Sequence, residues 1–588
     1  MQLPQRRYIA VLVLIPLIMA SFNSNWLYSQ IGFLDPWSNV GYFLHYGDPA
    51  FRPGTYKTDR LPWLLPGWVL YHVTSPIVAN FVLHIGALLI ATVYLYLTLA
   101  RLVGRDLAFL AAVFLTVYFP FLGSGGWDYQ NAGSGAYYAL TLYSLTRAAQ
   151  SERPAFGLFA AGVMFAATVH ANILFINMSP VIAGHYAVVS SARRRLALRP
   201  MLQAAGWACA GFVALTLVLC IINWSVGREF LFFQPILVMI HSYLEDPHLQ
   251  DRWWAPWSSG WIFWPTPTVA SGIGVPYLAV PMATILVGCW LLLRTPLSAW
   301  RDSAVATPLF LIVQFMLLSI LWIIWQSLGQ TALEPDYLAY PLIIPCVLGL
   351  AGIMSISQRT VPASPRTWLL FACLLLAFIP AAGVLEHLLA PQALPTRERI
   401  ASVQLFLLLA VLLVIALTQA RRWPLLPLTM IAMFEIYYPP FASIDVIYQA
   451  GVPCEFNVDA FRTLIALDRF VRERARLERT WLWYGPQEMS PGPKGCRFNL
   501  FYLRVSATAL SLNELGSETD TSVSQITDED IAQLMPGDSV ALVSADPSHA
   551  TEAIERFSRA GRHVGPVQQT QEMIGGARLF LQLLPIAR

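Results

Sequence analysis

The sequence contains few charged residues. Only 12% of its 588 residues are Asp, Glu, Lys or Arg, whereas 56% are hydrophobic. Soluble globular domains carry about 25% charged residues, so the composition excludes an ordinary soluble protein and indicates a polytopic membrane protein. The net charge is only +3, and we expect no nucleic-acid partner, because nucleic-acid-binding domains are strongly basic.

The cysteines lack the paired spacing of a zinc site. Five of the seven lie in apolar runs, where a single cysteine usually acts as a small hydrophobic residue: Cys209, Cys220, Cys289, Cys346 and Cys373. Cys454 and Cys496 lie in the polar C-terminal region. They could form a disulfide if that region faces an oxidising compartment.

Apolar runs long enough to cross about 30 Å of hydrocarbon occur along most of the chain. They predict thirteen membrane-spanning helices, near residues 8–25, 77–100, 107–122, 133–148, 155–171, 173–190, 201–223, 274–294, 307–328, 337–356, 367–386, 401–420 and 423–441. The first run resembles a signal peptide but has a poor cleavage site, so we interpret it as an uncleaved helix. The runs lack the buried chain of carboxylates expected of an ion-coupled transporter.

Basic residues divide the loops into two sets. One set holds sixteen basic and three acidic residues, and the alternate set holds seven basic and twelve acidic residues. Because cytoplasmic loops are enriched in Lys and Arg, we expect a cytoplasmic N-terminus. With thirteen spans, everything after about residue 441 is then extracytoplasmic, and the expected location is a bacterial inner (plasma) membrane.

The predicted fold class is mainly α, with about thirteen membrane helices and a small extracytoplasmic α/β domain. Residues 1–441 form the membrane domain, with a first loop at 26–76 and a second loop at 224–273, and residues 442–588 form the C-terminal domain. Strand-like runs "TWLWYG", "DSVALVSAD" and "ARLFLQLLPI" and the helical pattern "PSHATEAIERFSRAG" indicate the α/β module. A Gly-rich phosphate loop follows none of these strands.

The first loop contains most of the candidate chemistry, in "GFLDPWSNVGYFLHYGDPAFRPGTYKTDRLPWLLPGW". Asp35 is a good helix N-cap and Pro36 suits the first helical position, which predicts a short interfacial helix. One face of that helix would lie on the membrane and would consist of Trp37, Val40, Gly41 and Leu44. Asp35 could be a helix cap only, or a catalytic carboxylate.

Lys57 and Arg60 precede an apolar segment in the same loop. They suit a lipid phosphate, which Arg holds bidentately and Lys holds as a point charge. Anchoring to phospholipid headgroups explains them equally well. Tyr56, directly before Lys57, is a candidate substrate-binding residue.

Further candidates lie in other loops on the same predicted side. Asp128 is the one charged residue of "GSGGWDYQNAGSG", and His170 and Asn172 lie in "HAN", where they could donate to a phosphate or a sugar. Trp257 and Trp261 belong to a tryptophan-rich part of the second loop that could stack on a sugar. The alternatives are a turn residue, an interfacial histidine and a membrane-surface aromatic belt.

This arrangement resembles the GT-C superfamily of polyprenyl-phosphate-dependent glycosyltransferases, in the protein O-mannosyltransferase and aminoarabinose transferase branch. The resemblance is carried by Asp35 at the end of the first span, the following juxtamembrane helix, and "TDRLPWLLPGWVLYHV" (58–73), which is similar to that branch's basic-Pro-Pro-aromatic entry into the second span. The hairpin at 155–190, the thirteen spans and the outer C-terminal domain also fit.

The sequence departs from that branch at three positions. Asp35 is followed by Pro36 instead of Glu, the hairpin tip "TVHAN" lacks the usual Lys, and Asp336 stands where a basic residue is common. The sugar donor and the acceptor therefore cannot be transferred from the family.

The resemblance implies inverting transfer of a sugar from a polyprenyl-phosphate to an acceptor protein, glycan or lipid on the extracytoplasmic face. Asp35 would be the general base, Lys57, Arg60 and His170 would bind the donor phosphate, and Asp128 would orient the acceptor or help Asp35 to hold a divalent cation, Mg²⁺ or Mn²⁺. Superfamily members differ in their metal need, so no cofactor is assigned. A lipid-linked saccharide transporter or flippase, a surface-polysaccharide polymerase or ligase, and an inactive scaffold of the same fold are the alternatives.

Overall fold

The computed structural model describes the helical core and most of the C-terminal domain. The described residues are 5–22, 24, 27–28, 34–48, 51, 56–117, 121, 131–191, 197–245, 274–329, 335–360, 457–476, 479–484, 490–491, 497–498, 513–514, 527–574 and 577–587. They cover most of the helical bundle up to residue 360 and, from residue 457 onward, most of the C-terminal domain.

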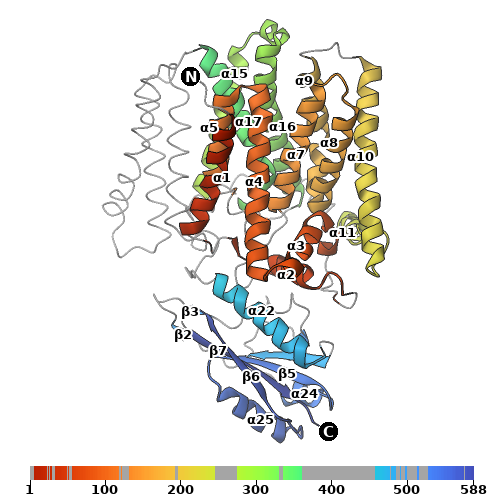
Figure 1. Cartoon of the computed structure of the whole chain (residues 1–588), viewed down its shortest axis with the longest axis vertical. Coiled ribbons are helices and arrows are strands. Elements are labelled where there is room, and N and C mark those ends of the chain that lie inside the picture. Colours follow the sequence, from red (N-terminus) through yellow and green to blue (C-terminus); the bar gives the residue numbers. More distant parts are fainter. Residues whose placement is uncertain are drawn as a thin grey trace, which may run out of the picture.

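The membrane part is a bundle of long helices that run roughly side by side (Figure 1). They are α1 (Gln5–Phe22), α4 (Pro76–Leu102), α5 (Arg105–Val117), α7 (Asn131–Ala149), α8 (Ala155–Ala171), α9 (Ser179–Ser191), α10 (Leu198–Ser225), α15 (Gly274–Arg294), α16 (Ser303–Gly329) and α17 (Pro335–Thr360). A 3₁₀ helix, η3 (Ile173–Met178), joins α8 to α9, and η5 (Leu297–Arg301) joins α15 to α16. Every predicted span before residue 361 thus coincides with a helix.

The number of spans stays a prediction. Within the described residues, three stretches are long and apolar enough to cross a membrane: Pro76–Leu102, Ile173–Ser191 and Leu198–Ser225. Shorter apolar helices, such as Ala155–Ala171 and Leu342–Ile356, accompany them. The last three predicted spans, 367–386, 401–420 and 423–441, lie outside the described residues.

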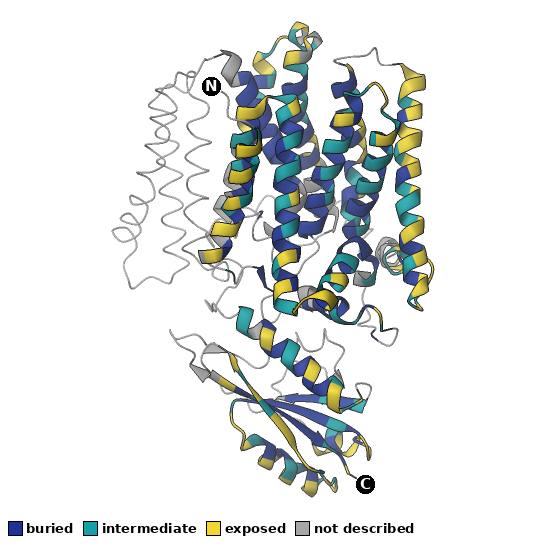
Figure 2. Cartoon of the chain, in the orientation of Figure 1, coloured by how far each residue is buried: buried dark blue, intermediate teal, exposed yellow. Residues whose placement is uncertain are grey.

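Small residues bring some of these helices into close contact. A Cβ atom at Gly162 of α8 would lie 1.9 Å from the carbonyl oxygen of Ala208 in α10, and one at Gly211 of α10 would lie 2.0 Å from the carbonyl oxygen of Phe159. Close backbone approach through small residues is typical of helix pairs in membranes. α10 lies at the edge of the bundle and is largely exposed along its length (Figure 2), as expected of a helix that faces lipid.

Short elements gather at one end of the bundle. The first loop folds into α2 (Leu34–His45), η2 (Tyr56–Asp59) and α3 (Leu61–Val73), and the second loop contributes α11 (Gln234–Glu245). α3 lies within the predicted first loop, and α4 starts at Pro76, one residue before the predicted start of the second span at 77. Thr74 and Ser75 separate α3 from α4, because Ser75 caps α4 with its side chain and Pro76 starts α4.

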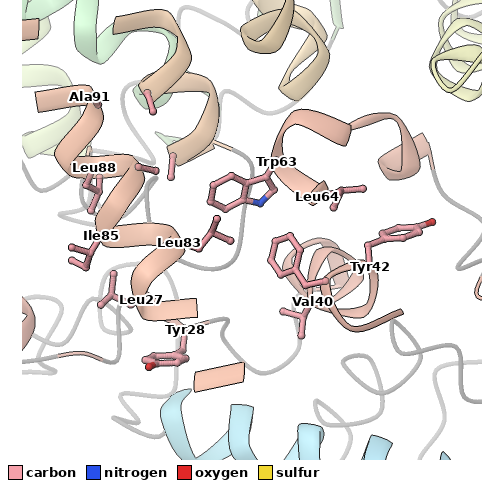
Figure 3. Packing of buried hydrophobic residues seen from close by; sticks show 14 of the residues in the cluster. Leu27, Tyr28, Val40, Tyr42, Trp63, Leu64, Leu83, Ile85, Leu88 and Ala91 are labelled. Carbon is pink, nitrogen blue, oxygen red and sulfur yellow. The ribbon is translucent and has the colours of Figure 1, made fainter. Parts of the chain in front are cut away.

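The core beneath these short helices is aromatic. Trp63 of α3 points toward Leu83 of α4, and Val40 and Tyr42 project from α2 close by (Figure 3). Trp63 is buried and its ring meets the rings of Phe43 and His84 edge to face. The first loop is therefore packed into the protein core and does not lie loosely over it.

The C-terminal domain contains a mixed sheet with the strand order β4-β1-β5-β7-β6. Its strands are β1 (Thr480–Tyr484), β4 (Asn513–Glu514), β5 (Ser539–Ser544), β6 (Gln568–Ile574) and β7 (Ala577–Pro585). β1 runs parallel to β4 and β5, whereas β7 is antiparallel to β5 and β6. A two-stranded piece, β2 (Ser490–Pro491) with β3 (Arg497–Phe498), and the helices α22 (Asn457–Arg474), α24 (Asp528–Ala532) and α25 (His549–Arg559) complete it.

The predicted α/β module is confirmed, since its three strand-like runs are β1, β5 and β7 and its helical pattern is α25. The central strand β5 is buried over most of its length, as the apolar run "VALV" requires. Helix α22 lies between the sheet and the end of the bundle that carries α2, α3 and α11 (Figure 1). The predicted domain boundary at 441 falls outside the described residues.

Candidate active site

The helix predicted after the first span is confirmed as α2, but its surroundings differ from the expectation. α2 begins at Leu34, so Asp35 lies in the first helical turn instead of at the cap. Negative charge is favourable there as well, because the helix dipole places positive potential at the N-terminus. The side chain of Asp35 is not among those described.

The predicted membrane face of α2 is wrong, because that face packs against protein. Trp37 and Val40 are completely buried, and the ring of Trp37 lies 5.7 Å from that of Phe461 in α22. Tyr28 meets Phe461 edge to face at 5.3 Å. The apolar spacing in α2 was identified correctly, but the helix packs against α3, and Phe461 of the C-terminal domain contacts Trp37.

A second link holds the other end of α2. Nε2 of His45 lies 2.9 Å from Oδ2 of Asp468, and Nε of Arg472 donates to Oδ1 of the same carboxylate at 2.8 Å. Arg472 also approaches Asp48, with 3.9 Å between Nη1 and Oδ2. α22 is therefore attached to both ends of α2, and it fixes the helix that carries Asp35.

Asp59, at the end of η2, is the most deeply buried carboxylate of the described part of the first loop. It is 3% exposed. Its Oδ2 accepts a hydrogen bond from the backbone N–H of Ile236 at 2.7 Å, and its Oδ1 accepts one from the hydroxyl of Thr58 at 3.1 Å. These contacts join the first loop to α11 of the second loop.

Burial raises the pKa of Asp59 from 3.8 to about 7. The hydrogen bonds from Ile236 and Thr58 and the charge of Arg60 act in the opposite direction, and Glu229 adds a small upward effect. The loss of hydration therefore outweighs the favourable contacts. Near neutral pH this carboxyl group exists in both its protonated and its ionised form.

Arg60 follows directly and initiates α3. It is 9% exposed, and its carbonyl accepts the backbone N–H groups of Trp63 and Leu64 at 2.9 Å. α3 is held in turn by Tyr137 of α7, whose hydroxyl donates to the carbonyl of Pro62 at 2.7 Å. Arg60 thus starts a helix that is anchored to the bundle.

Arg228, at the start of the second loop, holds the middle of the first loop. Its guanidinium donates to the carbonyl oxygens of Tyr46, Asp48 and Phe51 at 3.1–3.3 Å. Burial raises the pKa of Tyr46 to about 12 although Arg228 lowers it, so the phenol stays neutral and donates to Oδ1 of Asn223 at 2.9 Å. The two loops are therefore connected at Arg228 and at Asp59.

The other predicted site residues have different surroundings. Nε2 of His170 lies 2.8 Å from the hydroxyl oxygen of Thr216, within an aromatic cluster that includes Phe232. Asn172 caps η3, because its Oδ1 accepts the N–H of Leu174 at 3.2 Å. Both side chains have structural partners in this structure, and their roles in substrate binding stay predictions.

Several candidates cannot be placed by their side chains. Tyr56 and Lys57 have their backbone in η2, one turn before Arg60. Asp128, Trp257, Trp261, Cys454 and Cys496 lie outside the described residues. Among the side chains that are described, no group of three His, Cys, Asp or Glu residues could hold a metal ion. The divalent cation that Asp35 and Asp128 would share stays a prediction.

Sequence reasoning did not single out Asp59 and Arg228, which connect the two loops. It counted both only as loop charges. The one signal for Asp59 was its position directly before Arg60 in "TDRLPW". No sequence pattern around Arg228 indicates its contacts, because its partners are backbone carbonyls far away in the sequence.

Comparison with known proteins finds structural neighbours only. No protein-family model and no curated protein matches the chain. ArnT from Cupriavidus metallidurans in the apo state is 12% identical, with a TM-score of 0.47 over 98% of this chain and 97% of that one. The archaeal oligosaccharyltransferase AglB from Archaeoglobus fulgidus, in complex with an inhibitory peptide and a dolichol-phosphate, is 12% identical. Its TM-score is 0.41 over 94% of this chain and 72% of that one. The apo form of the Archaeoglobus fulgidus oligosaccharyltransferase is 12% identical, with a TM-score of 0.42 over 97% of this chain and 74% of that one.

These neighbours are members of the GT-C superfamily, which the sequence resembles. All three TM-scores are below 0.5 and all three identities are below 25%. The function of this protein must therefore be inferred from its own residues.

Proposed function

We propose that this protein is a membrane glycosyltransferase that moves a sugar from a polyprenyl-phosphate to an acceptor on the extracytoplasmic face, with inversion at the anomeric carbon. The observation that carries the proposal is the buried pair Asp59 and Arg60. It lies in the first loop, beside the helix that bears Asp35. α2 contacts both η2 and α3, so the elements that carry the candidate base and the candidate phosphate ligands pack against each other.

The charge balance of this pair favours an anionic ligand. Arg60 is always cationic, whereas Asp59 has a pKa of about 7. The fraction of Asp59 that is protonated near neutral pH lowers the negative charge beside Arg60. A lipid phosphate suits such a position, and Lys57, one turn earlier, adds a second cation. A buried guanidinium is well suited to phosphate because its planar fork binds two oxygens at once.

The position of the pair also suits a lipid-linked donor. α3 starts at Leu61, and its far end exposes Val69 and Val73. The polar start and the apolar surface thus belong to one short helix at the end of the bundle (Figure 1). A polyprenyl-phosphate has the same division, with a charged headgroup and a hydrocarbon chain.

In the proposed reaction, Asp35 accepts the proton of the acceptor hydroxyl while that oxygen attacks C1 of the sugar. The bond between C1 and the phosphate oxygen breaks from the opposite side, and its electron pair leaves with the lipid phosphate. Arg60 and Lys57 stabilise the charge that develops on the leaving phosphate. Asp128 orients the acceptor, and Trp257 and Trp261 stack on the sugar.

The test compares Asp35→Asn with the wild type in membranes supplied with polyprenyl-phosphate sugars. A general base contributes roughly 10²–10⁴-fold to the rate, so transfer should fall by at least about 100-fold at an unchanged unfolding temperature. Asp302→Asn is the matched control, because Asp302 is an exposed carboxylate at the start of α16 that bonds the N–H of Ala304. Undiminished transfer by Asp35→Asn would end the assignment of the base.

A lipid-linked saccharide flippase is distinguished by the same variants. Flipping breaks no glycosidic bond, so its rate should not depend on a proton acceptor at residue 35. Arg60→Ala should impair both activities, because each requires the phosphate. Transport that persists in Asp35→Asn without any sugar transfer in the wild type would favour the flippase.

A further inference from the structure

The N-terminus of α11 has one backbone donor that only the first loop satisfies. The first N–H groups of a helix have no partner within the helix. In α11 the N–H of Gln234 bonds the carbonyl of Leu231, Pro235 has none, and the N–H of Leu237 bonds the carbonyl of Phe233. The N–H of Ile236 remains, and it donates to Oδ2 of Asp59 at 2.7 Å.

This bond connects segments that are 177 residues apart. η2 and α11 pack against each other, and α11 lies at the same end of the bundle as α2 and α3 (Figure 1). The exposed surface of α11 is mixed. Leu237 is 52% and Val238 is 57% exposed, and Nε2 of the exposed His241 lies 3.1 Å from Oε1 of the exposed Glu245. Asp59 is therefore a buried attachment point at the N-terminus of a helix with both apolar and polar side chains at its surface.

The position of α11 determines where the rest of the second loop begins. The chain continues from Glu245 into the segment that contains Trp257 and Trp261. Lys57 and Arg60 flank Asp59 in sequence, so the anchor of α11 lies among the proposed phosphate ligands. A shift of α11 would change the surroundings of Asp59, which is the residue directly before Arg60.

We propose that Asp59 is a positioning residue whose carboxylate docks the N-terminus of α11 on the first loop and so sets the binding of the polyprenyl-phosphate donor. This rests on the proposed glycosyl transfer for its effect on activity, but not for the docking itself. Asp59 acts here as a hydrogen-bond acceptor and takes no proton from the substrate. Its role is thus different from that of Asp35.

Two substitutions at Asp59 distinguish a role as hydrogen-bond acceptor from a role as general base. Asp59→Asn keeps an oxygen that can accept the N–H of Ile236, but it cannot act as a proton acceptor. Asp59→Leu is similar in size and loses both properties. Asp302→Asn serves as the control, because it makes the same chemical change at an exposed carboxylate outside both loops.

The docking is measured by hydrogen–deuterium exchange of peptides that cover Gln234–Glu245, in the full-length protein. Loss of an amide partner raises local opening, and one hydrogen bond corresponds to about tenfold. The N-terminal amide of α11 should therefore exchange at least about tenfold faster in Asp59→Leu. Asp59→Asn should stay within about threefold of the wild type.

Transfer is measured in parallel, with separate KM and kcat values for the polyprenyl-phosphate sugar. Asp59→Leu should raise the donor KM about tenfold or more with a smaller change in kcat, and Asp59→Asn should restore most of the activity. An inactive Asp59→Asn with a protected amide would overturn the proposal, since Asp59 would then act through its charge or its proton. Unprotected exchange in the wild type would overturn it as well.

The exchange experiment needs no substrate. If the wild type shows no sugar transfer, the proposed function fails, but the exchange rates still decide whether Asp59 docks α11. If Asp59→Leu does not fold, Asp59→Asn alone distinguishes the acceptor from the base, because it retains the hydrogen bond.

Discussion

Replacement of Asp59 by Asn should stabilise the protein increasingly as the pH rises. Burial raises the pKa of Asp59 from 3.8 to about 7 in the folded protein. Between these two values the unfolded chain has released the proton and the folded protein still binds it. Folding stability therefore falls with rising pH across that window. Above pH 7 the full cost is present, and it is about 4 kcal/mol, since one pKa unit corresponds to about 1.4 kcal/mol.

The Asn variant has no titrating group at residue 59 in either state. Its stability relative to the wild type should thus increase between pH 5 and pH 8 by about 2.5 kcal/mol. This difference depends mainly on the two pKa values of Asp59, because the other titrating groups are common to both proteins. With an unfolding entropy of about 2.1 cal/mol/K per residue, it corresponds for a chain of 588 residues to an increase of about 2 °C in the difference between the two unfolding temperatures.

The chain provides its own probe for this measurement. Cys220 and Cys346 are buried and Cys209 is exposed, so a thiol-reactive fluorescent dye in detergent reports exposure of the core during heating. Asp302→Asn, which makes the same chemical change at an exposed carboxylate outside both loops, is measured as the control. A difference between Asp59→Asn and the wild type that stays constant over this range, or that shrinks as the pH rises, would refute the reasoning about Asp59.

Two further experiments test the packing that supports the site. Gly162→Ala places a Cβ 1.9 Å from the carbonyl oxygen of Ala208, and because backbone cannot move aside as a side chain does, α8 and α10 must separate at a cost of about 1–3 kcal/mol. The unfolding temperature of Gly162→Ala should therefore be lower than that of the control Gly206→Ala, where nothing lies within 4 Å of the added Cβ. A double-mutant cycle of His45→Ala and Asp468→Ala should give a coupling of about 0.5–3 kcal/mol, because the two side chains meet at 2.9 Å. Strictly additive effects would show that this contact does not join the domains.

Much of the fold follows from local patterns. The predicted span 155–171 coincides with α8 (Ala155–Ala171), and the run "DSVALVSAD" becomes the buried strand β5. These segments form because an apolar run of that length has few other ways to satisfy its backbone in a membrane or a core. The break between α3 and α4 was also present in the sequence, as Ser75 and Pro76, and the predicted second span began directly after it, at residue 77.

The candidate site was predicted less completely. Arg60 and the helix that bears Asp35 were identified, because they combine charge with a helix-start pattern. Asp59 was treated as an ordinary loop carboxylate, since its burial and its bond to Ile236 depend on a segment 177 residues away. His45 drew no attention, because its partner Asp468 is 423 residues away in a separate domain.

By itself, the sequence determined which segments are apolar helices, where the polar residues collect and that a small α/β module follows. These properties depend on composition and spacing over a few turns, which neighbouring residues determine directly. Only the tertiary structure decided which loop charges are buried and what they contact. Asp59 changes from a solvated carboxylate to the docking point of α11 because two distant loops exclude water around it, and loss of hydration is the effect that most strongly alters an ionisable group.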